Sequence, residues 1–232
     1  MAQLVGEDGN WSGGQDTLVQ TGDIVDRGPD TIALYNLFAK LRTQAKEAGG
    51  KVINIYGNPE KRKAAWDVRT GWLGSMIFSN FNISYVHHGH TIFSHGDMEP
   101  EWARLGIDTL NQIAHEAIWN SDFHAPIFQN SGPIWSRVLA MEEGGTMATC
   151  RRIEEAKKAL GVKRMISGHT PQHHTGKILS LCNGSYMVID VGISTYYGAH
   201  VAALEIYEHE DGGQSVYALY PDGRWLLSTT HP

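Results

Sequence analysis

Four side chains with metal-binding chemistry each follow a short apolar run that ends in a glycine-containing turn. The runs are TLVQTGD, VINIYGN, TIFSHGD and RMISGHT, and they lead to Asp23, Asn58, His95 and His169. One carboxylate, one amide oxygen and two imidazoles form a mixed oxygen and nitrogen donor set, which suits Mn, Fe or Zn better than Ca or Mg. A single residue of this kind is usually structural, but four beside glycines predict a shared metal site.

The elements that must position these residues are buried strands alternating with helices. Each apolar run has the length and flanking glycine of a buried strand, and YMVIDVG, ending near Asp190, adds a fifth. Apolar residues at helical spacing predict helices over residues 31–48, 107–119 and 146–161. This order predicts an α/β fold, a layered mixed β-sheet sandwich flanked by helices. In open α/β sheets ligands bind beyond the carboxyl ends of the strands, where these turns lie.

The bulk composition excludes several classes of function. The chain has 232 residues and a net charge of −6, which argues against nucleic acid as a partner. No apolar run has the ~18 residues of a membrane span, and no signal peptide is visible, so cytoplasmic location is the default expectation. Cys150 and Cys182 lack metal-type spacing. We expect two free thiols, with one disulfide as the alternative.

The motifs GDIVDRG, GNPE, SHGD, GPIWSR and GHTPQ, in this order, resemble those of the calcineurin-like metallophosphoesterases. Within that family the PPP-type phosphatases and the Shewanella-like phosphatase branch are the most similar. The resemblance extends over about residues 3 to 210 and implies a single phosphoesterase domain over residues 1–232. It also implies two divalent metals that activate water for attack on phosphorus.

The resemblance assigns a metal-binding role to each of the four strand-end residues. Asp23 matches the carboxylate that bridges the two metals, and the remaining three match ligands of the second metal: Asn58, His95 and His169. Asp97 and Glu99, just after His95, are expected to cap or line the loop rather than bind metal.

Two arginines and a second aspartate complete the implied site. Arg27 and Arg137 resemble the phosphate clamps of the family, because a planar guanidinium group can bind two phosphate oxygens at once. Asp26 matches the carboxylate that orients the catalytic histidine of the family motif GNHE. In this chain Pro59 stands at that histidine's position, so Asp26 has no such partner.

A second departure concerns the first metal. The family begins with a strand that ends in GDxHG, and the residues before LVGEDGNWSGG contain no such motif. We therefore expect a domain that lacks its first strand at the N-terminus and binds one metal rather than two.

These observations predict a metal-dependent phosphomonoester hydrolase of the protein Ser/Thr or Tyr phosphatase type, impaired by both departures. Its partner would be a phosphorylated protein or a small phosphomonoester. A phenolate leaves more easily than an alkoxide, so residual activity should favour aryl phosphates such as phosphotyrosine. The alternatives are a pseudophosphatase that binds phosphate or phosphoproteins and, less favoured, a dinucleoside polyphosphate hydrolase.

Overall fold

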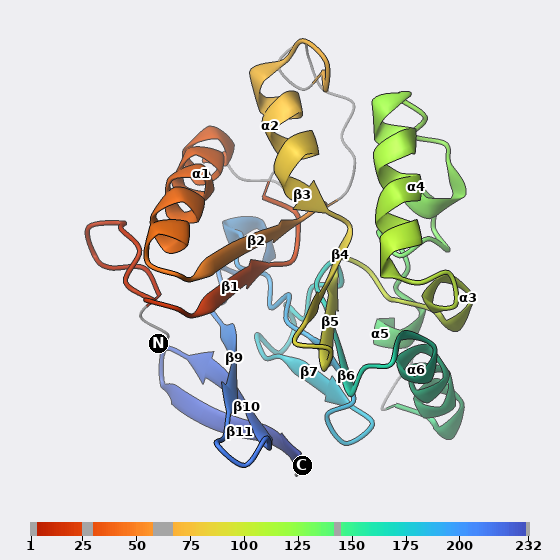
Figure 1. Cartoon of the computed structure of the whole chain (residues 1–232). Coiled ribbons are helices and arrows are strands. Elements are labelled where there is room, and N and C mark those ends of the chain that lie inside the picture. The colour runs from red at the N-terminus through yellow and green to blue at the C-terminus, as the bar shows by residue number, and fades with distance from the viewer. Residues whose placement is uncertain (1–3, 25–29, 58–66, 142–144, 231–232) are drawn as a thin grey trace. The chain divides into compact units, whose positions relative to one another are not determined.

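A computed structural model describes residues 4–24, 30–57, 67–141 and 145–230 (Figure 1). The chain forms two compact units. The first contains Met1–Leu18, Ile24–Val52 and Pro171–Pro232. The second contains Val19–Asp23 and Ile53–Thr170, and therefore most of the predicted site residues.

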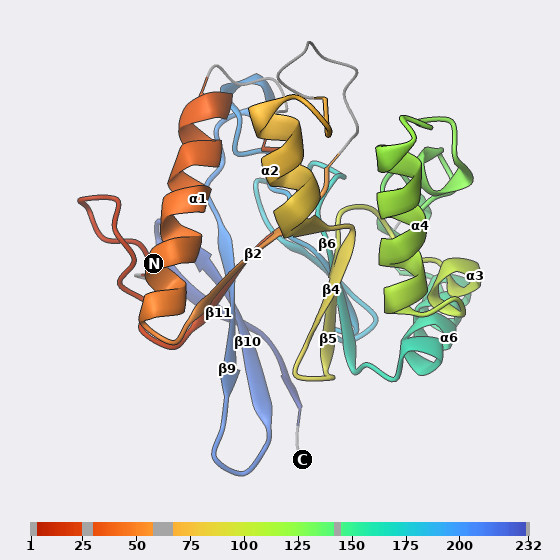
Figure 2. The same cartoon turned by 45° about the horizontal axis from the view of Figure 1, so that its top comes forward.

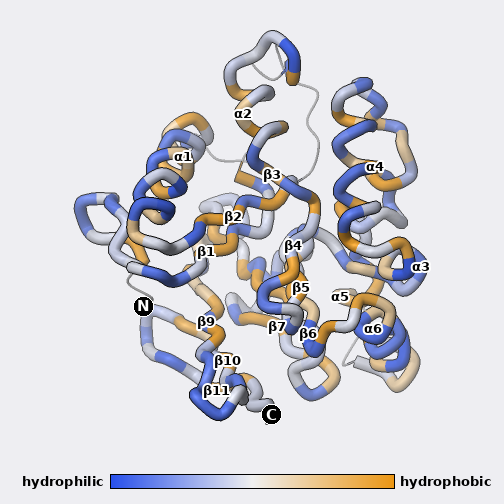
Figure 3. Tube along the Cα trace, in the orientation of Figure 1, coloured by the Kyte–Doolittle hydropathy of each residue, from blue (hydrophilic) through white to orange (hydrophobic). Residues whose placement is uncertain are grey.

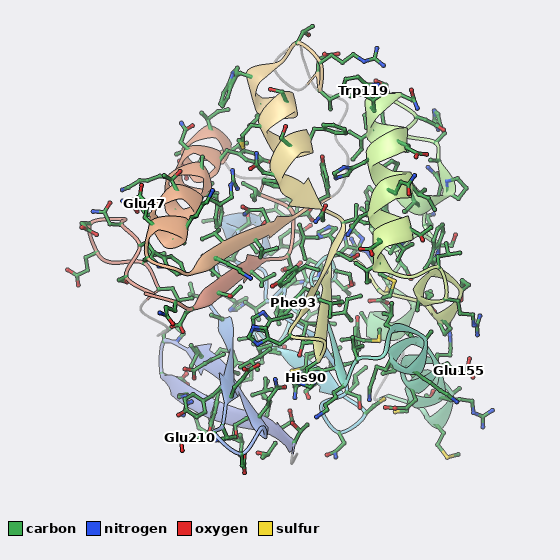
Figure 4. The ribbon with its side chains drawn as sticks, in the orientation of Figure 1. Glu47, His90, Phe93, Trp119, Glu155 and Glu210 are labelled. Atoms are coloured by element: carbon green, nitrogen blue, oxygen red, sulfur yellow. The ribbon has the colours of Figure 1, made fainter. Side chains whose placement is uncertain are left out.

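The second unit contains a mixed set of paired strands. Strand β5 (Thr91–Ser94) pairs antiparallel with β4 (Ser84–His87) and parallel with β6 (Arg164–Ser167). Every residue of β5 and β6 is buried, and Phe93, labelled in Figure 4, lies opposite Ile166. This register brings the carboxyl ends of β5 and β6 to the same edge.

Helices surround these strands in the second unit. Helices α2 and α4 lie side by side in two views, with the Phe78 and Trp119 rings 5.5 Å apart (Figures 1 and 2). Figure 3 shows hydrophobic residues along β5, whereas α4 alternates between hydrophilic and hydrophobic residues, as expected of an amphipathic helix. The helices are α2 (Trp72–Asn80), α3 (Pro100–Ala103), α4 (Ile107–Trp119), η2 (Pro126–Phe128), α5 (Val138–Met141) and α6 (Met147–Leu160).

Helix α1 (Thr31–Glu47) contributes to an apolar cluster of the first unit. Its residues Leu41 and Ala45 are buried together with Val52, and Trp11 packs against them. A three-stranded sheet has the order β1-β2-β3, in which β2 and β3 run parallel. Its strands are β1 (Thr17–Gln20), β2 (Lys51–Ile55) and β3 (Phe81–Asn82).

The C-terminal part of the first unit is antiparallel. Strands β7 (Leu179–Leu181) and β8 (Tyr186–Val188) form one pair. A three-stranded sheet follows the short helix η3 (Thr195–Tyr197), with β10 between its two neighbours. Its strands are β9 (Ala203–Glu208), β10 (Gln214–Tyr220) and β11 (Gly223–Thr230).

The predicted elements are present in the structure. All five apolar runs contain strands, and the three predicted helices are α1, α4 and α6. The expectation of free thiols is wrong, because both Cys150 and Cys182 are disulfide-bonded. Among the described residues, the helices are too short or too polar to cross a membrane.

Candidate metal centre

Asp23 follows β1 in a backbone conformation that few residues adopt. Its φ is 55°, in the left-handed region where aspartate, asparagine and histidine are enriched. Two glycines make room for Asp23 and for His95. A side chain at Gly57 would collide with the Asp23 backbone and carboxylate, and one at Gly22 would collide with the His95 ring. The glycines of the TGD and YGN turns therefore let the loops approach each other closely.

His95 follows β5, and one of its ring nitrogens is hydrogen-bonded to a backbone carbonyl oxygen. The side chain is 1% exposed, and Nδ1 lies 2.7 Å from the Thr21 carbonyl oxygen. Because a carbonyl oxygen can only accept a hydrogen bond, Nδ1 must carry the proton. In a neutral ring Nε2 is therefore bare, the form in which a histidine binds a metal.

His169 follows β6 at the same edge as His95. It is 3% exposed and has a φ of 63°, so it is a second ligand candidate in the left-handed region. The Gly168 N–H donates to the His95 carbonyl oxygen at 2.9 Å, which joins the two loops directly. The parallel register of β5 and β6 thus places both imidazoles together.

Three electron-rich atoms converge where these loops meet. His95 Nε2 lies 3.2 Å from Asp23 Oδ1 and 3.1 Å from His169 Nδ1. The three residues offer ligand atoms that all lie within 4.8 Å of one another. A bare imidazole nitrogen facing a carboxylate oxygen at this distance is unfavourable unless a cation or a shared proton lies between them. One oxygen and two imidazole nitrogens fit Mn, Fe or Zn.

The environment keeps His169 neutral, as a metal ligand must be. Burial is the main reason that its pKa falls to about 3, and electrostatic interactions with His95 and with the guanidinium group of Arg137 lower it further. The Asp23 carboxylate and a hydrogen bond to the Trp135 backbone act in the opposite direction. Metal binding to a neutral ring need not displace a proton into solution.

Arg137 and Trp135 border the cluster from the loop that precedes α5. Arg137 Nε donates to His169 Nε2 at 3.1 Å, which places a guanidinium group beside the predicted metal ligands. The Trp135 ring meets the His169 ring edge to face, with centroids 5.2 Å apart. Trp135 was not predicted from the sequence, although its place two residues before Arg137 in GPIWSR is a signal that could have found it.

Asp97 fixes the loop that carries Arg137 through hydrogen bonds to its backbone. It is fully buried, and its Oδ2 accepts hydrogen bonds from the N–H groups of Leu139 (2.7 Å) and Ala140 (3.1 Å) at the start of α5. Its own N–H donates to the Ser136 carbonyl oxygen at 2.9 Å. The capping expected of Asp97 is confirmed, and it fixes the backbone on both sides of Arg137.

The structure thus brings together four of the seven predicted site residues. These are Asp23, His95, His169 and Arg137. The other three, together with Pro59, lie outside the described residues: Asp26, Arg27 and Asn58.

Comparison with known sequences shows the family. The sequence model of the calcineurin-like phosphoesterases matches residues 3–173. An uncharacterised protein of Schizosaccharomyces pombe is 32% identical over 244 residues, covering 90% of this chain and 71% of that protein. Shewanella-like protein phosphatase 2 of Arabidopsis thaliana is 25% identical over 264 residues, covering 84% of this chain and 66% of its own length.

Solved structures show the same fold. A cold-active protein tyrosine phosphatase superposes with a TM-score of 0.74 and 22% identity, covering 97% of this chain and 71% of that one. The cold-active protein-tyrosine phosphatase of a psychrophilic Shewanella species gives a TM-score of 0.73 and 21% identity, with 97% and 73% coverage. The predicted α/β fold with mixed sheets is confirmed. With its family motifs, its fold and its cluster of an aspartate and two histidines, the chain belongs to the calcineurin-like phosphoesterase family.

Proposed function

We propose that this chain is a metal-dependent phosphomonoester hydrolase. The observation that carries the proposal is the convergence of Asp23, His95 and His169 beside the guanidinium group of Arg137, in a calcineurin-like phosphoesterase. Two matched relatives are named protein phosphatases, one from Arabidopsis thaliana and one from Plasmodium berghei. The proposed substrates are therefore phosphorylated proteins or small phosphomonoesters.

The proposed site residues have two roles: one set binds a cation, and the other binds the phosphoryl group. Asp23, His95 and His169 would bind a divalent ion, with Asn58 as the fourth ligand that the sequence predicts. Such an ion supplies activation of water and neutralisation of charge on the phosphoryl oxygens when bound. Arg137 and the predicted Arg27 would orient the phosphoryl group, because guanidinium forks match its oxygens.

We further propose that hydrolysis depends strongly on the leaving group, because Pro59 replaces the family's catalytic histidine. Proline cannot donate a proton, and general acid catalysis typically contributes ~10²–10⁴-fold in rate. A serine alkoxide needs that proton more than a phenolate does. Asp26, which would orient the missing histidine, has no such role here.

The test compares kcat/KM for p-nitrophenyl phosphate with that for a phosphoserine peptide. The wild-type protein should hydrolyse the aryl ester faster, and Pro59→His should raise the rate on the peptide more than on the aryl ester. Pro59→Ala is the matched control, since it removes the ring without adding an acid. It should leave the ratio of kcat/KM for the aryl ester to kcat/KM for the peptide unchanged. Equal rates on both substrates in the wild-type protein would refute the leaving-group proposal.

The second candidate is a pseudophosphatase that binds phosphorylated ligands without turnover, and Pro59 is the observation that favours it. It predicts retained affinity for inorganic phosphate through Arg137 with no hydrolysis of either substrate. Elemental analysis of the purified protein complements this test, because we propose one metal ion per chain. Two ions would contradict that stoichiometry. Action of residues 1–232 as one phosphoesterase domain remains a prediction.

A further inference from the structure

Glu99 is a buried carboxylate that the proposed reaction does not use. The residue is 2% exposed and stands at the N-terminal end of α3, where its carbonyl oxygen accepts from the N–H groups of Trp102 and Ala103. Both side-chain oxygens have partners. Ser136 Oγ donates to Oε1 at 3.3 Å, and the Arg152 guanidinium group pairs with Oε2. A buried carboxylate that binds a cation and a hydroxyl in this way holds both in a defined geometry.

The two partners of Glu99 come from different elements of the second unit. Arg152 lies on α6, which packs beside α3 in both views (Figures 1 and 2). Ser136 is fully buried and directly precedes Arg137. Its oxygen also accepts from the Val138 N–H at 3.5 Å, the limit of a hydrogen bond, on the other side of Arg137. Glu99 therefore connects helix α6 to both neighbours of the proposed phosphate ligand.

Arg137 needs such support because its side chain is long and only partly buried. The torsions of an arginine must be ordered before its guanidinium group can bind two phosphate oxygens at once. A fixed backbone restricts the positions that the group can reach, which lowers the cost of binding. Asp97 binds only backbone groups of this loop, so the Ser136 side chain provides a separate point of attachment.

We propose that Arg152 and Glu99 are positioning residues for the phosphate ligand Arg137. Through the Ser136 hydroxyl, their ion pair fixes the backbone from which the guanidinium group of Arg137 reaches the phosphoryl oxygens. Both residues act through Ser136 and not by contact with the substrate. This inference rests on the proposed function, and it adds two residues that lie outside the motifs SHGD and GPIWSR.

The charges around Glu99 explain why an arginine is required there. Burial raises the pKa of the Glu99 carboxyl, and Arg152 and the Ser136 hydroxyl oppose this rise, whereas the carboxylates of Asp97 and Glu101 add to it. Removal of Arg152 would leave a buried carboxylate without the cation that compensates it, and such a group takes up a proton or shifts. A neutral carboxyl accepts a hydrogen bond more weakly than a carboxylate, so Ser136 would be held less firmly.

A second ion pair between the same two elements provides a matched control. Arg104, which ends α3, pairs with Glu155 of α6, labelled in Figure 4, at 3.6 Å. Both of these side chains are exposed, whereas the Glu99 side chain is buried. Arg104→Gln therefore removes an arginine from the contact between α3 and α6 and leaves the Glu99 ion pair intact.

The experiment measures by calorimetry the affinity for inorganic phosphate in the presence of Mn²⁺, and the affinity for Mn²⁺ itself. Arg152→Gln and Ser136→Ala each remove one partner of Glu99, and Arg152→Lys keeps the positive charge. Arg152→Gln and Ser136→Ala are also made in an Arg137→Gln background. Such double-mutant cycles show whether two residues act through one another.

Arg152→Gln and Ser136→Ala should each weaken phosphate binding about threefold to tenfold, and Arg152→Lys should lose less. Arg137→Gln alone should weaken it about tenfold or more, because it removes a charge-assisted contact. In that background the other two changes should have no further effect. Arg104→Gln should match the wild type. Mn²⁺ affinity should be the same in Arg152→Gln, Ser136→Ala and the wild type, since neither change removes a proposed metal ligand.

Three results would overturn the proposal. The first is wild-type phosphate affinity in Arg152→Gln or in Ser136→Ala. The second is an equal loss from Arg152→Gln with and without Arg137, because the effect would then not pass through Arg137. The third is a parallel fall in Mn²⁺ affinity, which would assign the loss to a general disturbance of the loops. If Arg152→Gln does not fold, Ser136→Ala, which leaves the ion pair in place, decides by the same criteria.

Failure of the proposed function gives a different result. Wild-type phosphate affinity in Arg137→Gln would show that Arg137 is not a phosphate ligand, and this inference would be overturned with it. Weakened binding in Arg137→Gln together with wild-type binding in Arg152→Gln would overturn the positioning role alone.

Discussion

The loops at the ends of β5 and β6 and the sheet β9-β10-β11 are stabilised in opposite ways. The loops bury polar groups: His95, His169 and Asp97 are each at most 3% exposed, and His169 has left-handed backbone. The sheet is antiparallel, with a shift in the β10–β11 register between Val216 and Tyr217, and its central strand β10 buries apolar residues such as Val216 and Ala218. Electron-rich atoms in contact cost stability unless something positive joins them, whereas apolar packing stabilises by itself.

The two regions should therefore respond to different kinds of substitution. A cavity in the sheet should lower the free energy of unfolding without changing metal affinity. A changed ligand in the loops should lower metal affinity. Substitutions that change metal affinity without changing stability, or stability without changing metal affinity, therefore test this contrast.

The largest effect is expected for loss of a ligand. His169→Asn removes the Nδ1 donor, and Mn²⁺ affinity should fall by more than about 100-fold, since changes to groups that merely orient ligands already cost 10–100-fold. Calorimetric titration checks this. The exposed His124, replaced in the same way, is the control and should leave the affinity unchanged. Retention of tight binding in His169→Asn would show that the cluster is not the metal centre.

The sheet should show the reverse pattern. Val216 is fully buried on β10, so Val216→Ala removes two methyl groups and should lower the free energy of unfolding by about 2 kcal/mol. Urea denaturation measures the loss, and Mn²⁺ affinity of the folded variant should stay at the wild-type value. A fall in Mn²⁺ affinity would show that the sheet and the loops are coupled, and would contradict their expected independence.

Substitutions of Asp97 test whether its hydrogen bonds fix the loop that carries Arg137. Asp97→Ala leaves the N–H groups of Leu139 and Ala140 without their acceptor, which should cost about 1–3 kcal/mol of stability. Affinity for inorganic phosphate should fall several-fold because Arg137 is no longer fixed, while Asp97→Asn, which keeps an oxygen acceptor, should recover much of both. Equal losses of metal and phosphate affinity would contradict a role specific to the loop.

The smallest effect is the dependence of stability on pH. His169 has a pKa of about 3 when folded and an ordinary value of 6.5, so its neutral form is favoured by folding. The unfolded chain takes up this proton below pH 6.5, and the folded chain does so only near pH 3. Stability from His169 is therefore complete above pH 6.5 and is lost as the pH falls toward 3.

Urea midpoints of the metal-free protein at pH 7 and pH 5 measure this loss. The wild type should lose more stability over that interval than His169→Asn, whereas the matched change at His124 should keep the wild-type slope. Identical slopes in all three proteins would show that the fold does not disfavour protonation of His169.

Much of the fold and part of the site could be predicted from the sequence. Apolar runs beside glycine locate β5 and β6 because buried strands need little beyond length and hydrophobicity. The order of the motifs predicted that His95 and His169 belong to one metal site, although 74 residues separate them in the sequence. The Trp135 contact and the hydrogen bond of Arg137 could not be predicted, since they depend on how separate loops pack.

The left-handed backbone at Asp23 also bears on how this site would be lost in evolution. Asparagine tolerates that conformation as well as aspartate does and is almost the same size, so Asp23→Asn would leave the loop and its glycine contacts undisturbed. The negative charge that draws a cation would disappear while the shape of the site survived. This substitution would therefore leave the fold unchanged and would be detected only through the loss of metal affinity.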